Sequence, residues 1–165
     1  GIALIDSLPG HIYEVNPKFA QIAGRTLEEM LSIDWMSITH PDDVQEDLDN
    51  MTLLNAGKIN GFNMEKRYIL PDGSFVWIDM KITPLKAENE TQPCHLCMIQ
   101  DITAGKKAEE ALKSSEERLR TIFNAAKNVS LIITDAQDPE PKVMEFSPGA
   151  ERMFGYSSKE VRKCT

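Results

Sequence analysis

The stretch GHIYEVNPKFAQIAGRTLEEM, residues 10–30, is followed at residues 141–161 by a related stretch, PKVMEFSPGAERMFGYSSKEV. In this alignment Pro17 meets Pro148 and Gly24 meets Gly155. Both stretches predict the same order of elements: a strand, an Asn-Pro or Ser-Pro helix start, a glycine, and a second helix capped by Thr or Ser. We therefore expect two copies of one module, the second represented by its first part only.

On either side of residues 10–30, the first copy shows strand signals. Residues 1–7 and 11–15 are short apolar runs around a Leu-Pro-Gly turn, which predicts a β-hairpin. Residues 62–70 and 74–85 flank Pro-Asp-Gly, a strong hairpin signal, and a last strand is expected over residues 93–100. Hairpin connections predict an antiparallel sheet.

Helices are expected between these two groups of strands. One begins at Asn16-Pro17, a second at Thr26, and a third at His40-Pro41, which continues with apolar residues at helical spacing until Gly57. For His40 we expect a capping role at the surface. The order of strands, helices and further strands predicts the α+β class.

A long charged helix is predicted over residues 104–126, where Ala, Glu, Lys, Leu and Arg dominate. One side of it follows a heptad pattern, formed by Ala108, Leu112, Ser115, Leu119, Ile122 and Ala126. Two interpretations remain open. The helix either pairs in parallel with a second copy in a homodimer, or packs on its own domain as a linker.

Composition excludes several classes of protein. A net charge of −8 argues against nucleic acid and anionic lipid as partners, because both need clustered Lys and Arg. No apolar run approaches the roughly 18 residues of a membrane span, so we expect no direct membrane contact by this segment. Three cysteines, an odd number, do not form a disulfide framework, so a reducing cytoplasm is the simplest location. This location is compatible with a membrane-anchored parent protein.

Several motifs together resemble the PAS sensory family. They are Asn16-Pro17-Lys18-Phe19-Ala20, His40-Pro41-Asp42-Asp43, Glu65-Lys66-Arg67, Pro71-Asp72-Gly73 followed by Trp77, and Asp101-Ile102-Thr103. Residues 108–126 are similar to the signalling helix that joins successive PAS domains. The resemblance implies a five-stranded antiparallel sheet with helices on one face, followed by a long helix. It also implies a division into a sensory domain at residues 1–103, a helical linker at 104–127, and the start of a second PAS domain at 128–165.

Cofactor signatures of the family are missing from the expected places. Flavin-binding photosensors carry a reactive Cys in the segment that corresponds to residues 16–21, and oxygen sensors carry a haem-ligating His in the helix that corresponds to residues 44–57. This chain has neither, which argues against flavin and haem and leaves an unknown small molecule or no cofactor. Cys94 and Cys97 lack a second ligand pair, and on a strand they point to opposite faces, so we expect no metal site.

The remaining candidate site is a cavity between helices and sheet. Its expected lining is Phe19, Ile22, Trp35, Met64, Ile78, Met80 and Met98. The alternative is that these side chains fill the core completely. We expect Phe75 and Trp77, on the opposite face of the sheet, to contact a flanking helix or a partner subunit. The same contacts are expected of Leu112, Leu119 and Ile122 in the long helix.

The predicted arrangement suggests a function for this segment. No set of residues for catalysis is visible in the sequence, so the segment itself is not expected to be an enzyme. We expect a sensory module that detects a ligand or a partner contact and relays it through Asp101, Ile102 and Thr103 to an output domain of the same polypeptide, such as a histidine kinase or a diguanylate cyclase. The alternative is a ligand-free dimerisation or scaffold module.

Overall fold

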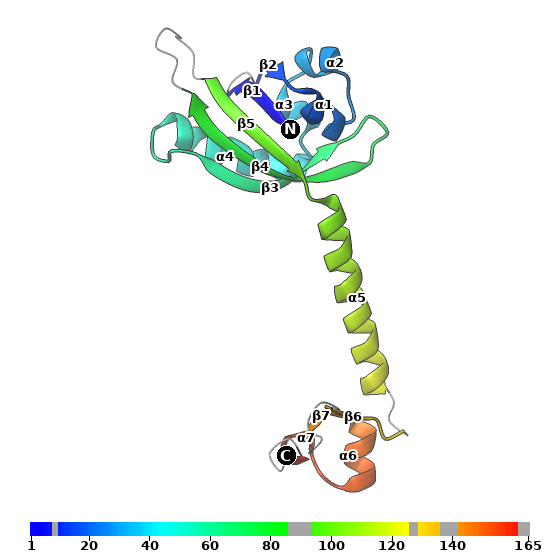
Figure 1. The fold of residues 1–165 in the computed structure, drawn as a ribbon. Helices are drawn as coiled ribbons and strands as arrows, with labels where there is room; N and C mark the ends of the chain where they lie inside the picture. The colour runs from blue at the N-terminus through cyan, green and yellow to red at the C-terminus, as the bar shows by residue number, and fades with distance from the viewer. Residues whose placement is uncertain (8–9, 86–93, 126–128, 136–141, 162–165) are drawn as a thin grey trace. The chain divides into compact units, whose positions relative to one another are not determined.

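The computed structural model describes residues 1–7, 10–85, 94–125, 129–135 and 142–161. The backbone divides into two units, Gly1–Lys107 and Ala108–Thr165. The first unit contains a five-stranded antiparallel sheet in the order β2-β1-β5-β4-β3, with helices α1 to α4 on one face (Figure 1). The predicted α+β class and sheet are therefore confirmed.

The strands begin and end close to the predicted turns. They are β1 (Ile2–Asp6), β2 (Ile12–Val15), β3 (Phe62–Ile69), β4 (Phe75–Leu85) and β5 (Cys94–Asp101). Both predicted hairpins form, β1 with β2 and β3 with β4. β5 lies between β1 and β4, and pairs Cys97 with Ala3 on one side and with Ile82 on the other. The first and last strands of the unit thus meet in the middle of the sheet.

Capping residues explain where the helices begin. The four helices are α1 (Pro17–Ile22), α2 (Leu27–Leu31), α3 (Trp35–Ile38) and α4 (Pro41–Asn55). The Asn16 side chain accepts a hydrogen bond from Phe19 N at 2.9 Å, and Thr26 with Glu29 forms the predicted capping box. Helix α3 was not predicted from the sequence. Its four residues are too short to show a helical period, and only Asp34 at its N-cap marks it.

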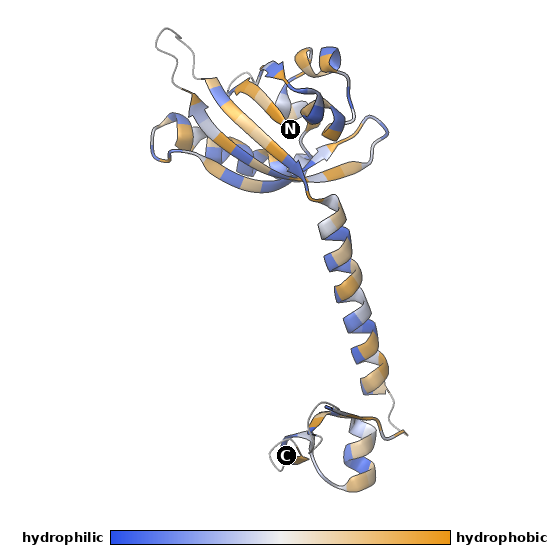
Figure 2. Ribbon diagram, viewed as in Figure 1, coloured by the Kyte–Doolittle hydropathy of each residue, from blue (hydrophilic) through white to orange (hydrophobic). Residues whose placement is uncertain are grey.

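The core lies between the helices and the inner face of the sheet. Along β4 the inner residues Val76, Ile78, Met80 and Ile82 are buried, as the alternation predicts. Figure 2 shows this alternation of hydrophobic and hydrophilic residues along the strands. α1 contacts β1 and β5, while α4 contacts β3 at the edge of the sheet. The opposite face of the sheet carries Glu65, Phe75, Asp79 and Lys81, all exposed.

The second unit repeats the start of the first. It contains β6 (Ile132–Thr134), β7 (Val143–Phe146), α6 (Pro148–Phe154) and α7 (Ser158–Val161), and β6 pairs antiparallel with β7. Ser147 Oγ accepts hydrogen bonds from Leu131 N and Ala150 N, as Asn16 Oδ1 does from Ile2 N and Phe19 N. The repeat seen in the sequence is therefore a repeat of the same local structure.

Candidate functional site

Two charged side chains lie inside the apolar core of the first unit. Lys66 from β3 and Asp47 from α4 form an ion pair, and each side chain is only 1% exposed. The Lys66 ammonium also donates to Thr39 Oγ1 at 3.2 Å and lies 5.2 Å and 5.0 Å from the ring centroids of Trp35 and Tyr68. Removing an ammonium group from water costs several kcal/mol of free energy. The attraction to the partner carboxylate and the added hydrogen bond offset this cost.

Asp47 is compensated less completely than Lys66. Its Oδ2 atom accepts from Lys66, but among the described residues its buried Oδ1 atom has no hydrogen-bond partner. A buried polar atom without a partner costs about 1–3 kcal/mol. The contact between α4 and β3 therefore contains a buried charge pair whose carboxylate is only partly satisfied.

Around this pair, apolar and polar side chains enclose a small internal space. Its lining is Ile5, Phe19, Trp35, Asp47, Met51, Lys66, Tyr68, Met80 and Cys97. The space has no room for a water molecule. Burial raises the pKa of the Cys97 thiol to about 12 and raises the pKa of the Tyr68 phenol well above its usual value, so both side chains are neutral at physiological pH.

The predicted cavity lining is distributed over three places. Phe19, Trp35 and Met80 line the enclosed space. Three others, Ile22, Met64 and Ile78, are buried in the same core but do not line it. The prediction for Met98 is wrong. Met98 is half-buried and alternates with the inner residues Cys97 and Ile99, so it lies on the outer face of the sheet.

The sheet passes into the long helix α5 (Thr103–Ala125) without a loop. β5 ends at Asp101 and α5 begins two residues later. Trp77, in β4, anchors this junction: its backbone N donates to Thr103 Oγ1 at 3.0 Å, and its carbonyl accepts from Ile102 N at 3.0 Å. Asp101 Oδ1 accepts from Thr103 N at 2.8 Å. The three residues expected to relay a signal thus lie where the sheet holds the start of α5.

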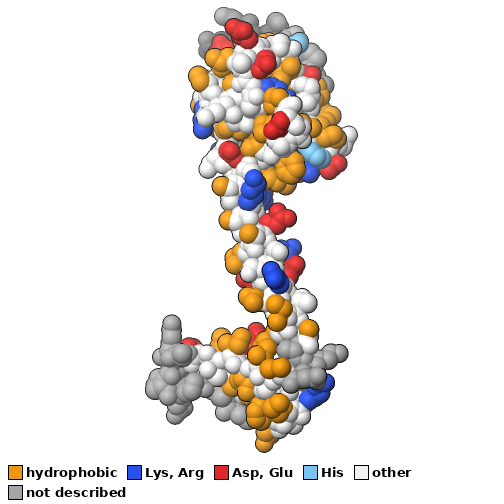
Figure 3. Space-filling model, turned by 90° about the vertical axis from the view of Figure 1, so that its right-hand side faces the viewer, with side chains coloured by type: hydrophobic (Ala, Val, Ile, Leu, Met, Phe, Trp, Pro, Cys, Tyr) orange, Lys and Arg blue, Asp and Glu red, His pale blue; other side chains and the backbone are white. Residues whose placement is uncertain are grey.

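The residues expected to contact a helix or a partner lie on exposed surfaces. Phe75 is 49% exposed on the outer face of the sheet, and Trp77 beside it is half-buried. Leu112, Leu119 and Ile122 are 62%, 65% and 54% exposed. Figure 3 shows hydrophobic side chains at the surface of α5, interspersed with charged ones.

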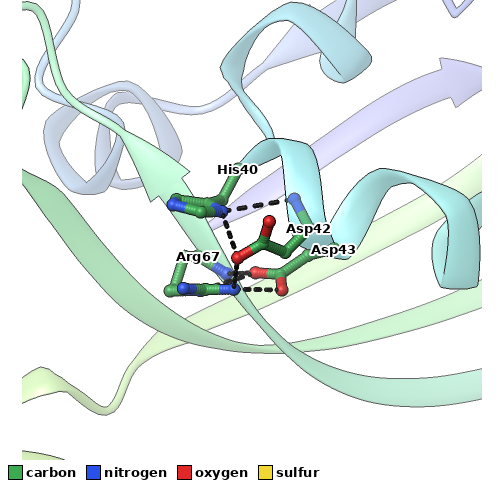
Figure 4. Close-up of polar contacts among 4 residues, drawn as sticks. All are labelled: His40, Asp42, Asp43 and Arg67. Atoms are coloured by element: carbon green, nitrogen blue, oxygen red, sulfur yellow. Dashed lines mark hydrogen bonds and ion pairs between the residues drawn. The ribbon is translucent and has the colours of Figure 1, made fainter.

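A second polar cluster fastens α4 to the edge of the sheet (Figure 4). The Arg67 guanidinium donates to both carboxylate oxygens of Asp43, at 2.9 Å and 2.6 Å, and pairs with Asp42 at 3.3 Å. His40 is the N-cap of α4, as predicted, and its Nδ1 accepts from Asp42 N at 3.3 Å. Burial alone would raise the pKa of the Asp43 carboxyl, but the hydrogen bonds and charge of Arg67 lower this pKa below its usual 3.8.

Acid should weaken this contact. The pKa of Asp43 is lower in the folded state than in the unfolded state, so its contribution to stability is present above pH 3.8 and is lost as the pH falls through the folded pKa. We expect Asp43→Asn to flatten the loss of stability below about pH 4. Urea unfolding at a series of pH values measures this, with Asp49→Asn, an exposed change on the same helix, as control. An equal loss in wild type and Asp43→Asn would refute the prediction.

Neither a metal site nor a membrane span is visible in the described part of the chain. Cys94 and Cys97 lie at opposite faces of β5, and the described residues hold no group of three or more His, Cys, Asp or Glu suited to a metal ion. Among the same residues, no helix has both the length and the apolar character needed to cross a membrane.

Comparison with known proteins assigns the family. A model of the PAS fold matches residues 12–99, more than half of the chain. The chain belongs to the PAS family. A second model, of the PAS domain, matches residues 117–164, so the second unit is a further PAS copy in tandem with the first.

Curated relatives of these PAS domains are large signalling proteins. The chain is 28% identical over 131 residues to the probable diguanylate cyclase DgcE of Escherichia coli, covering 79% of this chain and 12% of that protein. It is 25% identical over 165 residues to the sensor histidine kinase TmoS of Ectopseudomonas mendocina, covering 98% of this chain and 17% of the relative. The chain therefore spans less than a fifth of the length of these relatives.

Solved structures share the PAS fold. A sensory box histidine kinase/response regulator from Burkholderia thailandensis matches with a TM-score of 0.55 and 24% identity, covering 73% of this chain and 90% of that one. A PAS domain from Colwellia psychrerythraea matches with a TM-score of 0.54 and 22% identity, covering 62% and 86%. At this identity the likeness concerns the fold.

Proposed function

We propose that the first PAS domain, residues 1–103, senses a signal in its core and passes it through a helical linker, residues 104–127, to an output domain of the same polypeptide. The second PAS copy, residues 128–165, follows this linker. The signal is a small ligand or a contact with a partner, and the output is a histidine kinase or a diguanylate cyclase, the activities of the two curated relatives. We also propose a cytoplasmic location, which the odd number of cysteines, three, supports.

The observation that carries this proposal is the junction between β5 and α5. The Trp77 backbone hydrogen-bonds to Ile102 N and to the Thr103 hydroxyl, so a shift of the central strands moves the first turn of α5 with them. The core contacts the same strands, because Cys97 of β5 and Met80 of β4 line the enclosed space. A small change in the core thereby biases α5 between two positions.

Replacing Asp101 with Ala tests this relay. The change removes the acceptor of Thr103 N and costs about 1 kcal/mol of stability, as for other helix caps, which leaves the domain folded. In the full-length protein, we expect the output activity of Asp101→Ala to stop responding to the stimulus. Asp79→Ala, an exposed change on the outer face of the sheet, is the control. An Asp101→Ala protein that responds as the wild type does would refute the relay through this junction.

We further propose that the chain forms a parallel homodimer through α5. The apolar positions Leu112, Leu119 and Ile122 are exposed and recur at heptad spacing, and none of the residues of α5 is buried. In a dimer, a change in the position of the first turn alters how the two helices pack.

Leu119→Glu is expected to convert the dimer to a monomer, because it places a charge on each helix in the apolar seam. Thr121→Glu adds the same charge about 200° around the helix, on the opposite side, and is expected to leave the dimer intact. Sedimentation velocity over a concentration series measures both. A wild-type protein that stays monomeric throughout, or a Leu119→Glu protein that dimerises equally well, would contradict the parallel pair.

The alternative function is a scaffold module without a ligand. It is favoured by the enclosed space in the core, which has no room for a water molecule. Mass spectrometry of the small molecules released from the denatured, purified protein separates the two. A stoichiometric compound would support ligand sensing, whereas a clean extract together with an output insensitive to Asp101→Ala would support the scaffold.

A further inference from the structure

Three consecutive residues of β3 each form an ion pair with a helix. Glu65 pairs with Lys106 in the first turn of α5, Lys66 with Asp47, and Arg67 with Asp43. Successive strand residues point to opposite faces. Lys66 therefore reaches the core, while its two neighbours lie outside it. The single strand β3 thus contacts both the helix that borders the core and the helix that leaves the sheet.

Trp77 brings the outer contacts together. It is paired with Arg67 across β3 and β4, and the Arg67 guanidinium lies 5.3 Å from its ring centroid. The Lys106 ammonium lies 5.4 Å from the same centroid, while the Lys106 side chain is 33% exposed. The indole therefore contacts two cations, one on β3 and one on α5. Its backbone holds Ile102 and Thr103, so backbone and side chain both fix the start of α5.

We propose that Glu65 and Lys106 are positioning residues that hold the first turn of α5 on β3, and that the Lys66–Asp47 pair makes this position depend on the core. This route rests on the proposed sensory function but is separate from the junction at Asp101. It gives α4, which has no direct backbone connection to α5, an influence on the output helix.

The physical basis is that successive side chains of β3 alternate between the two faces of the sheet. A movement of α4 that displaces Asp47 leaves the Lys66 ammonium buried without its anion. Because an unpaired buried charge is costly, the side chain and the peptide groups of Lys66 move in response. A rotation of residue 66 about the strand axis moves Glu65 on the opposite face. Glu65 then changes its distance from Lys106, and the first turn of α5 loses or gains a contact.

Amide hydrogen exchange of residues 104–107, measured by NMR on this chain, tests the proposal. An exposed ion pair contributes up to about 1 kcal/mol, so Lys106→Met and Glu65→Gln are each expected to speed exchange there about two- to fivefold. Lys107→Met, at the exposed neighbouring lysine, is the matched control and is expected to change nothing. Exchange in Lys106→Met at the wild-type rate would overturn the positioning role.

The link to the core needs a double-mutant cycle. Asp47→Leu combined with Lys66→Met replaces the buried pair by apolar side chains, a change that generally preserves folding. We expect it to alter exchange at residues 104–107 and to be non-additive with Lys106→Met. Additive effects, or no effect of the apolar pair, would overturn the coupling. Because no output domain takes part, this result is independent of whether the relay through Asp101 operates.

Discussion

Lys66→Met is expected to lower the free energy of unfolding by about 3–5 kcal/mol, because it leaves the Asp47 carboxylate buried without its cation. Both side chains are 1% exposed, and Asp47 Oδ1 already lacks a partner among the described residues. Urea unfolding followed by circular dichroism measures the loss.

Removing both charges should restore most of this stability. A buried ion pair replaced by apolar side chains of similar volume is often neutral or stabilising. We therefore expect Asp47→Leu with Lys66→Met to be more stable than Lys66→Met alone. A loss of less than about 1 kcal/mol in the single variant would mean that the pair is not buried in solution as described.

Phe19→Ala is the second change with a large expected effect, a loss of about 3–5 kcal/mol. The Phe19 side chain is 1% exposed, lines the enclosed space and lies 6.1 Å from the Tyr68 ring. Its removal deletes these contacts and leaves a cavity that the short helix α1 closes only in part. The same urea measurement gives the loss.

Phe75→Ala is the matched control for Phe19→Ala. Phe75 is 49% exposed on the outer face, so its truncation is expected to cost less than about 1 kcal/mol. Equal losses at the two positions would show that the helices do not pack on the inner face of the sheet in solution.

Most of the fold could be predicted from the sequence because each turn and each helix cap has a local chemical cause. The Asn16 and Thr26 caps and the Pro71-Asp72-Gly73 turn act within a few residues, so a single sequence displays them. The start of α5 was readable for the same reason, since Asp101 accepts from Thr103 N two residues away. Helix α3 has only four residues and shows no such period.

Met98 was misplaced because β5 is apolar on both faces. Residues 94–99 read CHLCMI, in which alternation of hydrophobicity gives no indication of which side faces inward. The sheet decides it. Cys97 pairs with Ile82, an inner residue of β4, and residues paired across neighbouring strands share a face. That information is non-local, and the apolar character of Met98 alone suggested the wrong side.

The buried charges were missed because Lys and Asp are normally expected at the surface. A signal was nevertheless present. Lys66 lies between Met64 and Tyr68 in the alternation of β3, which places it on the inner face, and Asp47 lies one turn before Met51 on α4. Each residue alone reads as an exception to the pattern. Only the pairing of α4 with β3 shows that the two exceptions compensate each other.

Transmission from the core to α5 can be measured in the full-length protein without knowing the stimulus. Asp47→Asn weakens the buried pair and imitates a signal in the core. We predict that it shifts the basal activity of the output domain, that Asp101→Ala reduces this shift, and that Asp101→Ala combined with Lys106→Met removes it. A shift of equal size with and without Asp101→Ala would contradict transmission through the β5–α5 junction.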